Sequence, residues 1–387
     1  MVSHMFEYQH TLLLRSDGKA VAFGSNMCGQ CSIPPLDQGT FYSQVSAGAS
    51  HSVLLRSDGL AVACGLKDQG RCQIPALGEG LCYTQVSAGG GHTVILRSDG
   101  CAIACGQNDC GQCDIPPLPE GMSYIQVSAG LEHTLLLRSD GIAVASGKND
   151  DGQCNLPPLD EGTSYTQVSA GAFHTALLRS DGDAVACGSN SFGQCEIPPL
   201  AEGMSYMRIS AGYHYTVLLQ NDGLAKSCGS NECGQCDILP LDRGMFYTEV
   251  FAGLDHTVLL QSDGHAVAFG ANRCGECKIP SPRQGHCYVP NHTPLDKSLV
   301  LQLDCVSKGD AVKFRCSDLA GKEKLRLKAH RSDLALNLLK YIACKLSVNL
   351  QSLQLIGPDG QLLAALCHAN PKAKIQEVTG SITTAAG

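Results

Sequence analysis

Short apolar runs, each ended by turn residues, follow one another through most of the chain. In one such unit, residues 44–47, 51–55 and 61–64 are predicted as three short strands. Asp58 and Gly59 stand between the last two runs and predict a tight turn, because both residue types tolerate a positive φ. The runs are continuous rather than strictly alternating, which favours strands that are covered on both faces.

The unit repeats seven times at a fixed spacing of 41 residues. A Tyr and a Gly-x-Cys return in the same register as the Asp-Gly pair. The Asp-Gly pairs are Asp17 and Gly18, Asp58 and Gly59, Asp99 and Gly100, Asp140 and Gly141, Asp181 and Gly182, Asp222 and Gly223, and Asp263 and Gly264. The Ile-Pro-Pro-Leu passage at 33–36 predicts a sheet edge or a connection, because proline has no N–H for a central ladder.

Three or four strands per unit, repeated seven times, predict an all-β seven-bladed β-propeller over residues 1–290. A blade cannot bury both faces alone, so stacking and ring closure must supply the stability. Tyr288 and Val289 begin an eighth first strand that stops at Pro290. We therefore expect a closing blade that combines the N-terminal segment with residues near 286–290. Small residues such as those at 46–48 are expected near the axis.

A different pattern follows a Pro-punctuated linker at 291–297. Residues 298–387 predict a small α+β domain, with strands at 298–305, 311–316 and 324–328 and a helix capped by Ser332. A hairpin at 353–356 and 361–363 is expected after the helix. The order ββαββ resembles the ubiquitin-like β-grasp fold, and an unrelated small α+β domain is the alternative. The tail lacks a diglycine, which argues against conjugation as a modifier.

Charge and cysteine content restrict the function classes. Residues 1–290 carry 15 Lys and Arg against 28 Asp and Glu, and residues 291–387 carry 13 against 8. An acidic body argues against binding to a phosphate backbone. No segment resembles a signal peptide or reaches 18 apolar residues, and 22 cysteines without a secretion signal fit a reducing compartment. We expect a cytosolic or nuclear monomer that does not contact a membrane.

Every unit contains Ser, His and Asp, but their periodicity argues against a catalytic triad. A catalytic site needs one converging constellation, whereas these residues recur around the ring. We expect no enzyme activity, no cofactor and no metal, and expect the repeated His to make a hydrogen bond within its own blade. The positions assigned to structure are His51, His92, His133, His174, Asp58, Gly59, Asp99, Gly100, Asp140, Gly141, Asp181 and Gly182.

Four C-x-x-C pairs leave three alternatives open: structural cysteines, a metal site or a redox site. The pairs are Cys28 and Cys31, Cys110 and Cys113, Cys233 and Cys236, and Cys274 and Cys277. The second cysteine belongs to the repeat, and the first position also holds Gln69, Asp151 and Phe192. This variation favours the structural alternative.

Positions that vary between copies are the better candidates for recognition. The residues just before the repeated His should lie on one face of a propeller, where large and charged side chains form an arc. We predict a partner-binding patch of Leu131, Glu132, Phe173, Tyr213, His214, Leu254 and Asp255. Tolerated variation in loops is the alternative.

The repeat resembles the regulator of chromosome condensation repeat family. One copy matches the family pattern at Gly89, His92, Leu96, Asp99, Gly100, Gly106, Asn108, Gly111 and Gln112. The resemblance covers about residues 1–290 and implies a seven-bladed propeller. The chain departs from the family in having no Trp, Tyr215 in one His position and Lys67 in one Asn position.

The resemblance and the predicted patch favour a non-catalytic scaffold or adaptor that holds a protein on one propeller face. The C-terminal domain would link it to a second protein, with the ubiquitin pathway as one setting. The alternative is guanine-nucleotide exchange on a small GTPase, the activity of the founding family member. Enzyme inhibition of the bacterial propeller type is a third alternative.

Overall fold

The computed structural model describes residues 9–242, 245–282 and 287–289, and the backbone of four further strands between 299 and 356. The chain divides into two compact units. The first consists of residues 1–240 and 246–292, and the second of residues 241–245 and 293–387.

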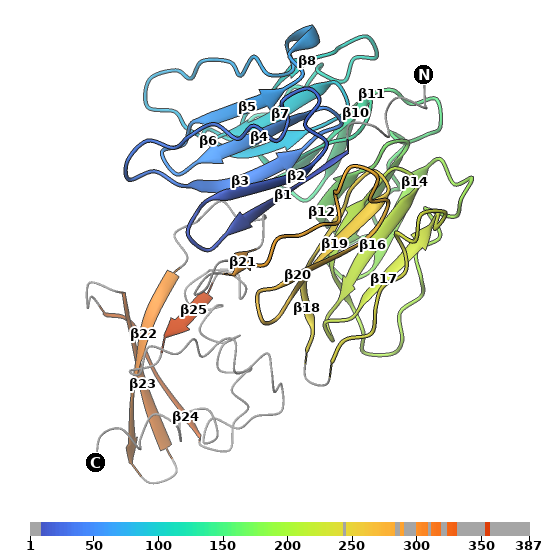
Figure 1. Ribbon diagram of the computed structural model, residues 1–387. Coiled ribbons are helices and arrows are strands. Elements are labelled where there is room, and N and C mark those ends of the chain that lie inside the picture. The colour runs from blue at the N-terminus through green and yellow to red at the C-terminus, as the bar shows by residue number, and fades with distance from the viewer. Residues whose placement is uncertain are drawn as a thin grey trace. The chain divides into compact units, whose positions relative to one another are not determined.

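The first unit is a propeller of seven three-stranded antiparallel sheets (Figure 1). The fold class is therefore the one that the repeat predicts, with three strands in each blade. The inner strands are β3 (Tyr42–Ala47), β6 (Tyr83–Ala88), β9 (Tyr124–Ala129), β12 (Tyr165–Ala170), β15 (Tyr206–Ala211), β18 (Tyr247–Ala252) and β21 (Tyr288–Val289).

Each inner strand pairs with a middle strand, which pairs in turn with an outer strand. The middle strands are β1 (His10–Arg15), β4 (His51–Arg56), β7 (His92–Arg97), β10 (His133–Arg138), β13 (His174–Arg179), β16 (Tyr215–Gln220) and β19 (His256–Gln261). The outer strands are β2 (Ala20–Gly24), β5 (Ala61–Gly65), β8 (Ala102–Gly106), β11 (Ala143–Gly147), β14 (Ala184–Gly188), β17 (Ala225–Gly229) and β20 (Ala266–Gly270).

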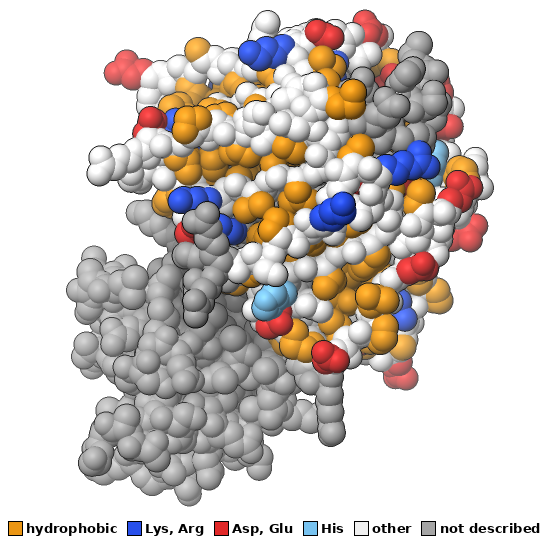
Figure 2. Space-filling model, viewed as in Figure 1, with side chains coloured by type: hydrophobic (Ala, Val, Ile, Leu, Met, Phe, Trp, Pro, Cys, Tyr) orange, Lys and Arg blue, Asp and Glu red, His pale blue; other side chains and the backbone are white. Residues whose placement is uncertain are grey.

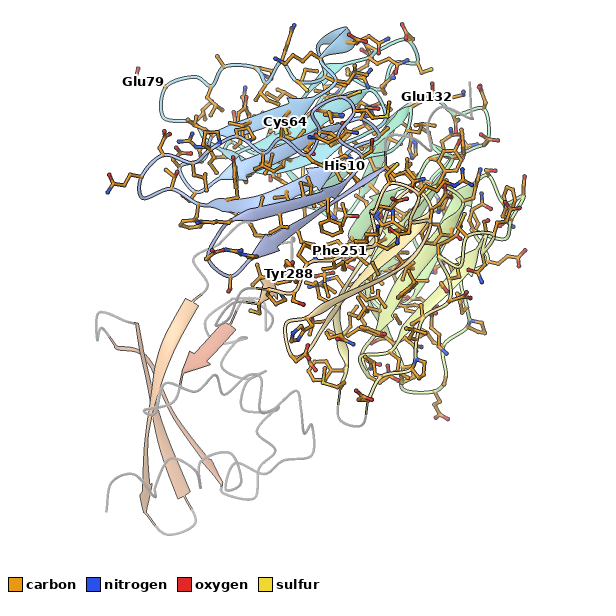
Figure 3. The ribbon with its side chains drawn as sticks, in the orientation of Figure 1. His10, Cys64, Glu79, Glu132, Phe251 and Tyr288 are labelled. Carbon is orange, nitrogen blue, oxygen red and sulfur yellow. The ribbon has the colours of Figure 1, made fainter. Side chains whose placement is uncertain are left out.

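The two ends of the repeat array share one blade, as the phase of the copies predicts. Strand β1 pairs with β2 on one side and with β21 on the other, where Leu14 lies opposite Val289 and Arg15 opposite Tyr288. Figure 3 shows Phe251 and Tyr288 near each other where the last blade meets this closing blade, and both belong to one apolar cluster. The closing blade packs against both of its neighbours, so the ring is closed.

Apolar side chains between adjacent blades form the core. In one cluster, Val53 and Leu55 of β4 pack against Tyr83 and Val86 of β6 and Ile95 of β7, all nearly inaccessible to water. Stacking of this kind removes apolar area from both faces of a blade at about 25 cal/mol per Å². The continuous apolar runs of the middle strands follow from this two-sided burial.

The proline passage is a connection between blades and not a strand. The tyrosine that starts each inner strand is buried and donates its hydroxyl to a backbone carbonyl of this passage. Tyr42, for example, donates to the carbonyl of Pro34 at 2.7 Å. Because the phenol end of the tyrosine finds an acceptor, the ring can be buried without an unsatisfied polar group.

The second unit holds a four-stranded sheet of β22 (Leu299–Lys308), β23 (Ala311–Asp318), β24 (Glu323–His330) and β25 (Leu353–Ile356). The strand order is β24-β23-β22-β25, and only the pairing of β22 with β25 is parallel. Three strands precede residue 331, one more than the order ββαββ contains. The predicted helix from Ser332 and the predicted strand at 361–363 lie outside the described residues.

Candidate functional site

The histidine of each repeat lies at the start of a middle strand, buried between two blades. Its Nε2 approaches a hydroxyl of the next blade, so the expected hydrogen bond within one blade is wrong: the bond joins two blades. The pairs are His10 with Ser52 (2.8 Å), His51 with Thr93 (2.9 Å), His92 with Thr134 (2.9 Å), His133 with Thr175 (3.1 Å), His174 with Thr216 (2.9 Å) and His256 with Thr11 (2.8 Å).

Hydrogen-bond geometry fixes the protonation state of this histidine. Thr134 donates its hydroxyl proton to the carbonyl of Gln112 at 2.7 Å, so His92 must donate from Nε2 and Nδ1 carries no proton. Nδ1 is buried and meets no hydrogen-bond partner. Burial lowers the pKa of His92 to about 3, so the ring is neutral and serves the architecture of the ring.

Tyr215 keeps the link between blades in the one unit that lacks the histidine. Its hydroxyl donates to the carbonyl of His256 at 2.5 Å. The Tyr215 oxygen also lies 3.2 Å from the hydroxyl oxygen of Thr257, which donates to the carbonyl of Gln235 at 2.7 Å. The longer side chain thus spans the same gap with a different acceptor.

The Asp-Gly turns have the geometry that a tight turn requires. In the second blade, Asp58 accepts from the backbone N–H of Leu60 at 3.2 Å and pairs with Arg56 at 2.6 Å. Gly59 has φ +80°, and a Cβ there would lie 2.4 Å from Cys82. The turn therefore needs glycine both for its backbone conformation and for the close approach of the next blade.

We call the loop that follows each outer strand the exit loop. The exit loop after β5 differs in conformation from the others because its sequence differs. In most units the Asn accepts from a backbone N–H, as Asn108 does from Cys113 at 2.8 Å. Lys67 cannot accept, and its loop forms a 3-10 turn, η1 (Asp68–Gly70), with Gln69 at φ 58°. Arg71 then holds the loop by donating to the carbonyl of Gly90 at 3.1 Å.

The repeated cysteine of the Gly-x-Cys is half-buried and donates its thiol to a backbone carbonyl six residues earlier. The seven contacts are 3.1–3.4 Å long and involve Cys31, Cys72, Cys113, Cys154, Cys195, Cys236 and Cys277. Burial raises the pKa of Cys31 and Cys113 to about 11, which keeps these thiols protonated. Protonated thiols are poor metal ligands and poor nucleophiles.

The cysteines that the structure describes are free thiols, and its described residues contain no cluster of three metal-ligating side chains. We predict that the purified full chain holds no stoichiometric zinc, because each C-x-x-C pair has one thiol committed to its own loop. Elemental analysis by plasma mass spectrometry checks this. One tightly held zinc per chain after dialysis against a weak chelator would support the metal alternative instead.

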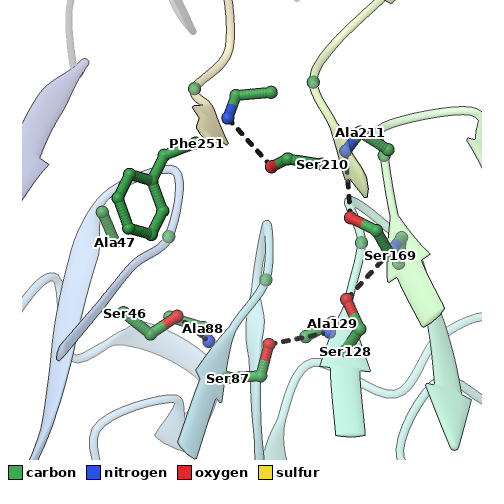
Figure 4. A pocket seen from close by; sticks show the side chains of 18 of the residues that line it. Ser46, Ala47, Ser87, Ala88, Ser128, Ala129, Ser169, Ser210, Ala211 and Phe251 are labelled. Carbon is green, nitrogen blue, oxygen red and sulfur yellow. Dashed lines mark hydrogen bonds between the residues drawn. The ribbon is translucent and has the colours of Figure 1, made fainter. Parts of the chain in front are cut away.

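The central channel is lined by the small residues of the inner strands and has a volume of about 260 Å³. Figure 4 shows five serines that link the blades: each hydroxyl accepts a backbone N–H of the next blade, at 2.9–3.0 Å. In the blade of β18, β19 and β20, Phe251 stands in the position of these serines. The repeated serine positions therefore hold the blades together and bring no titratable groups to the channel wall.

The predicted patch lies at the loop end of the middle strands, where the structure brings three of its side chains into contact. The rings of Phe173 and His214 are stacked, with their centroids 5.4 Å apart. Tyr213 meets both rings edge-on, with centroid distances of 5.3 Å to Phe173 and 4.4 Å to His214. A further ring, Phe192 from the neighbouring exit loop, lies 4.7 Å from His214. We call Phe173, Phe192, Tyr213 and His214 the aromatic patch.

Sequence reasoning missed Phe192, although the signal was present. Phe192 occupies the position that holds the first cysteine in four other units, so a phenyl ring there is an exception to the repeat. It is 45% exposed, whereas Phe173 and His214 are half-buried and Tyr213 is only 5% exposed. Phe192 thus offers the accessible ring face, and Tyr213 supports the cluster from below.

The remaining predicted residues flank the aromatic patch. Glu132, labelled in Figure 3 at the loop end of β10, forms an ion pair with Lys148 at 2.9 Å. Asp255 is buried and accepts from Gln9 at 3.2 Å, and burial raises the pKa of its carboxyl. Leu131 and Leu254 are half-buried, and their backbone groups hydrogen-bond neighbouring blades at 3.3 and 3.0 Å.

The electrostatic environment of the aromatic patch is acidic. Burial lowers the pKa of His214, while the carboxylates of Glu232 and Asp151 act in the opposite direction. Both carboxylates are exposed, and burial favours the neutral form of the imidazole. On the face that Figure 2 shows, blue Lys and Arg side chains lie singly among orange, white and red ones. That face therefore carries no broad basic surface of the kind that grips a phosphate backbone.

Repeats, blades and loops define a seven-bladed β-propeller. Residues 83–112, 124–153 and 165–194 match the family model of the regulator of chromosome condensation (RCC1) repeat, so the chain carries repeats of this family. No curated protein sequence matches the chain.

Solved structures share the fold. Prp20p from Saccharomyces cerevisiae superimposes with a TM-score of 0.57 and 17% identity over 82% of this chain and 94% of that one. Human WBSCR16 gives a TM-score of 0.54 and 16% identity over 68% and 81% of the two chains. The ectodomain of the Arabidopsis thaliana receptor kinase ACR4 gives a TM-score of 0.53 and 17% sequence identity, and the match covers 69% of this chain and 91% of that one. At these identities the likeness extends to the fold alone. Within the described ranges, no helix is long and apolar enough to cross a bilayer.

Proposed function

We propose that the propeller is a protein-interaction scaffold that holds its partner on the face of the aromatic patch. The observation that carries the proposal is the break in the repeat at one sector of that face. Before the repeated His, two neighbouring units have Ser50 and Gly91, whereas the sector beyond them has Phe173 and His214. An accessible aromatic cluster ringed by polar groups is typical of interface hot spots.

Quantitative affinity purification of the full chain tests this proposal. The bait with Phe173→Ala and Phe192→Ala should lose specific partners at least tenfold, because a hot-spot aromatic contributes about 2 kcal/mol or more to binding. Ser50→Ala and Cys110→Ala change the same two positions of the repeat in other blades, and they should keep those partners. If the wild type, the Phe173 and Phe192 variant and the Ser50 and Cys110 control have equal melting temperatures and capture the same partners equally, the interface lies elsewhere.

A second candidate is guanine-nucleotide exchange on a small GTPase. The observation that favours it is the shared fold with Prp20p, whose structure was reported with its binding properties to Gsp1p and histones. A fluorescent nucleotide-release assay against a panel of small GTPases separates the two functions. Accelerated release would favour exchange. A link of the C-terminal domain to the ubiquitin pathway, and a location in the cytosol or nucleus, remain predictions from sequence.

A further inference from the structure

The aromatic patch combines flat apolar rings with carboxylates, and this combination suits one kind of ligand group. Phe192 exposes nearly half of its surface, and its ring lies against His214. Asp151 occupies the same position as Phe192 in the preceding blade, and Glu232 lies in the next exit loop. The negative charges of both raise the pKa of His214, against the effect of burial, so both carboxylates belong to the surroundings of the rings.

Cationic side chains near the patch are already engaged by acidic neighbours. Lys148 pairs with Glu132 at 2.9 Å and lies 3.8 Å from Asp150. Arg273 lies toward Asp255 and lowers the pKa that burial raises there. Asp151 and Glu232 are exposed, and neither forms an ion pair with a described cation. The sector between Lys148 and Arg273 therefore presents apolar rings and negative charge.

We propose that this sector binds an arginine side chain in an extended basic segment of the protein partner. The guanidinium would lie over the exposed ring of Phe192 and donate to the carboxylates of Asp151 and Glu232. This inference rests on the proposed function and specifies the chemistry of its partner.

Arginine fits this site better than lysine for two physical reasons. Its planar cation stacks on an aromatic face, and the attraction strengthens as the cation loses water. Its fork of N–H donors also meets carboxylates in pairs, which a point-charge ammonium cannot do. The acidic balance of residues 1–290 would increase the association rate of a basic segment, an effect that salt screens.

Fluorescence anisotropy with the full chain and a labelled Gly-Ser-Arg repeat peptide tests the inference. In a control peptide, citrulline replaces arginine, so the side chain keeps a planar end group but has no charge. This peptide should bind at least about tenfold more weakly. A lysine peptide should bind several-fold more weakly than the arginine peptide, since it loses the stacking plane. Equal binding of the arginine and citrulline peptides would overturn the proposal.

Variants locate the site on the chain. We expect two variants to bind the arginine peptide about tenfold more weakly. One is Phe192→Ala, and the other combines Asp151→Asn with Glu232→Gln. Cys110→Ala and Asp109→Asn are the matched controls, because they occupy the positions of Phe192 and Glu232 in another blade. An equal loss in the controls would show unspecific attraction to an acidic body and contradict the inference. If the captured partners still depend on Phe173 and Phe192 but the arginine peptide does not bind, the scaffold function stands and the arginine inference fails.

Discussion

Mild acid should unfold the propeller, with most of its stability lost between about pH 6.5 and pH 5. Burial lowers the pKa of His51, His92 and His174 to about 3 and that of His133 and His256 to about 4. In the unfolded chain each imidazole takes up a proton near pH 6.5. Below that pH the unfolded state binds more protons, so stability is complete above the unfolded pKa and falls as the pH falls.

The expected effect is large because five sites act together. At about pH 5, each histidine that stays neutral in the fold lowers the free energy of unfolding by about 2 kcal/mol, because the unfolded chain binds a proton there. The five histidines together lower it by about 10 kcal/mol. That sum is comparable to the whole stability of a typical domain. A protonated Nδ1 would also find no acceptor in the structure, since that atom is buried without a partner in all five residues.

Thermal unfolding followed by circular dichroism across this pH range checks the prediction. His133→Gln retains a donor for Thr175 and should remove about one fifth of the pH dependence. His265→Gln is the matched control, because His265 is exposed on a turn and the substitution leaves all five buried histidines in place, so the fall in melting temperature should remain. A melting temperature that stays level from pH 7 to pH 5 would contradict neutral histidines between the blades.

Gly89→Ala should destabilise the propeller by about 3–5 kcal/mol or prevent folding. A Cβ at Gly89 would lie 2.5 Å from the carbonyl oxygen of Gly130 in the next blade and 2.6 Å from the ring of His92. Neither group can move away without breaking a hydrogen bond. The carbonyl accepts the N–H of Gly90 at 3.0 Å, and the ring is held by Thr134 at 2.9 Å. The methyl group would therefore separate two blades or break the link between them.

Gly78→Ala is the matched control for this substitution. Its Cβ would meet only the side chain of Leu81, at 3.5 Å, which is an ordinary contact. Alanine in a permissive loop reduces the entropy of the unfolded chain, so a change of less than about 1 kcal/mol is expected. Urea unfolding of both variants measures the difference. If Gly89→Ala unfolds at the same urea concentration as the wild type, the close contact between blades is incorrect.

Periodicity made the propeller predictable, because each repeated residue meets the same neighbours in every blade. The turn at Asp58 and Gly59 and the closing blade at Tyr288 both follow from the register alone. The partner of His92 could not be found in this way. Its acceptor, Thr134, lies 42 residues away, in the next blade, and sequence spacing does not show which face of a strand meets the neighbouring sheet.

The aromatic patch was partly predictable for the opposite reason. Phe173 and His214 stand out as breaks in the repeat, but the contact of His214 with Phe192 depends on how an exit loop folds over the neighbouring blade. Residues that the sequence predicts to share one role also differ in their exposure to solvent. Tyr213 and Asp255 are buried, so they support the surface while Phe192 presents it.

Hydrogen–deuterium exchange of the full chain with and without the arginine peptide tests the central claim most directly. The claim is that in-register residues build the ring and that the exceptions on one face recognise the partner. Protection should appear in segments around 171–174, 190–194 and 212–214, and the equivalent segments around 48–51 and 89–91 should not change. Equal protection of the equivalent segments in every blade, or protection confined to the channel strands, would contradict the claim.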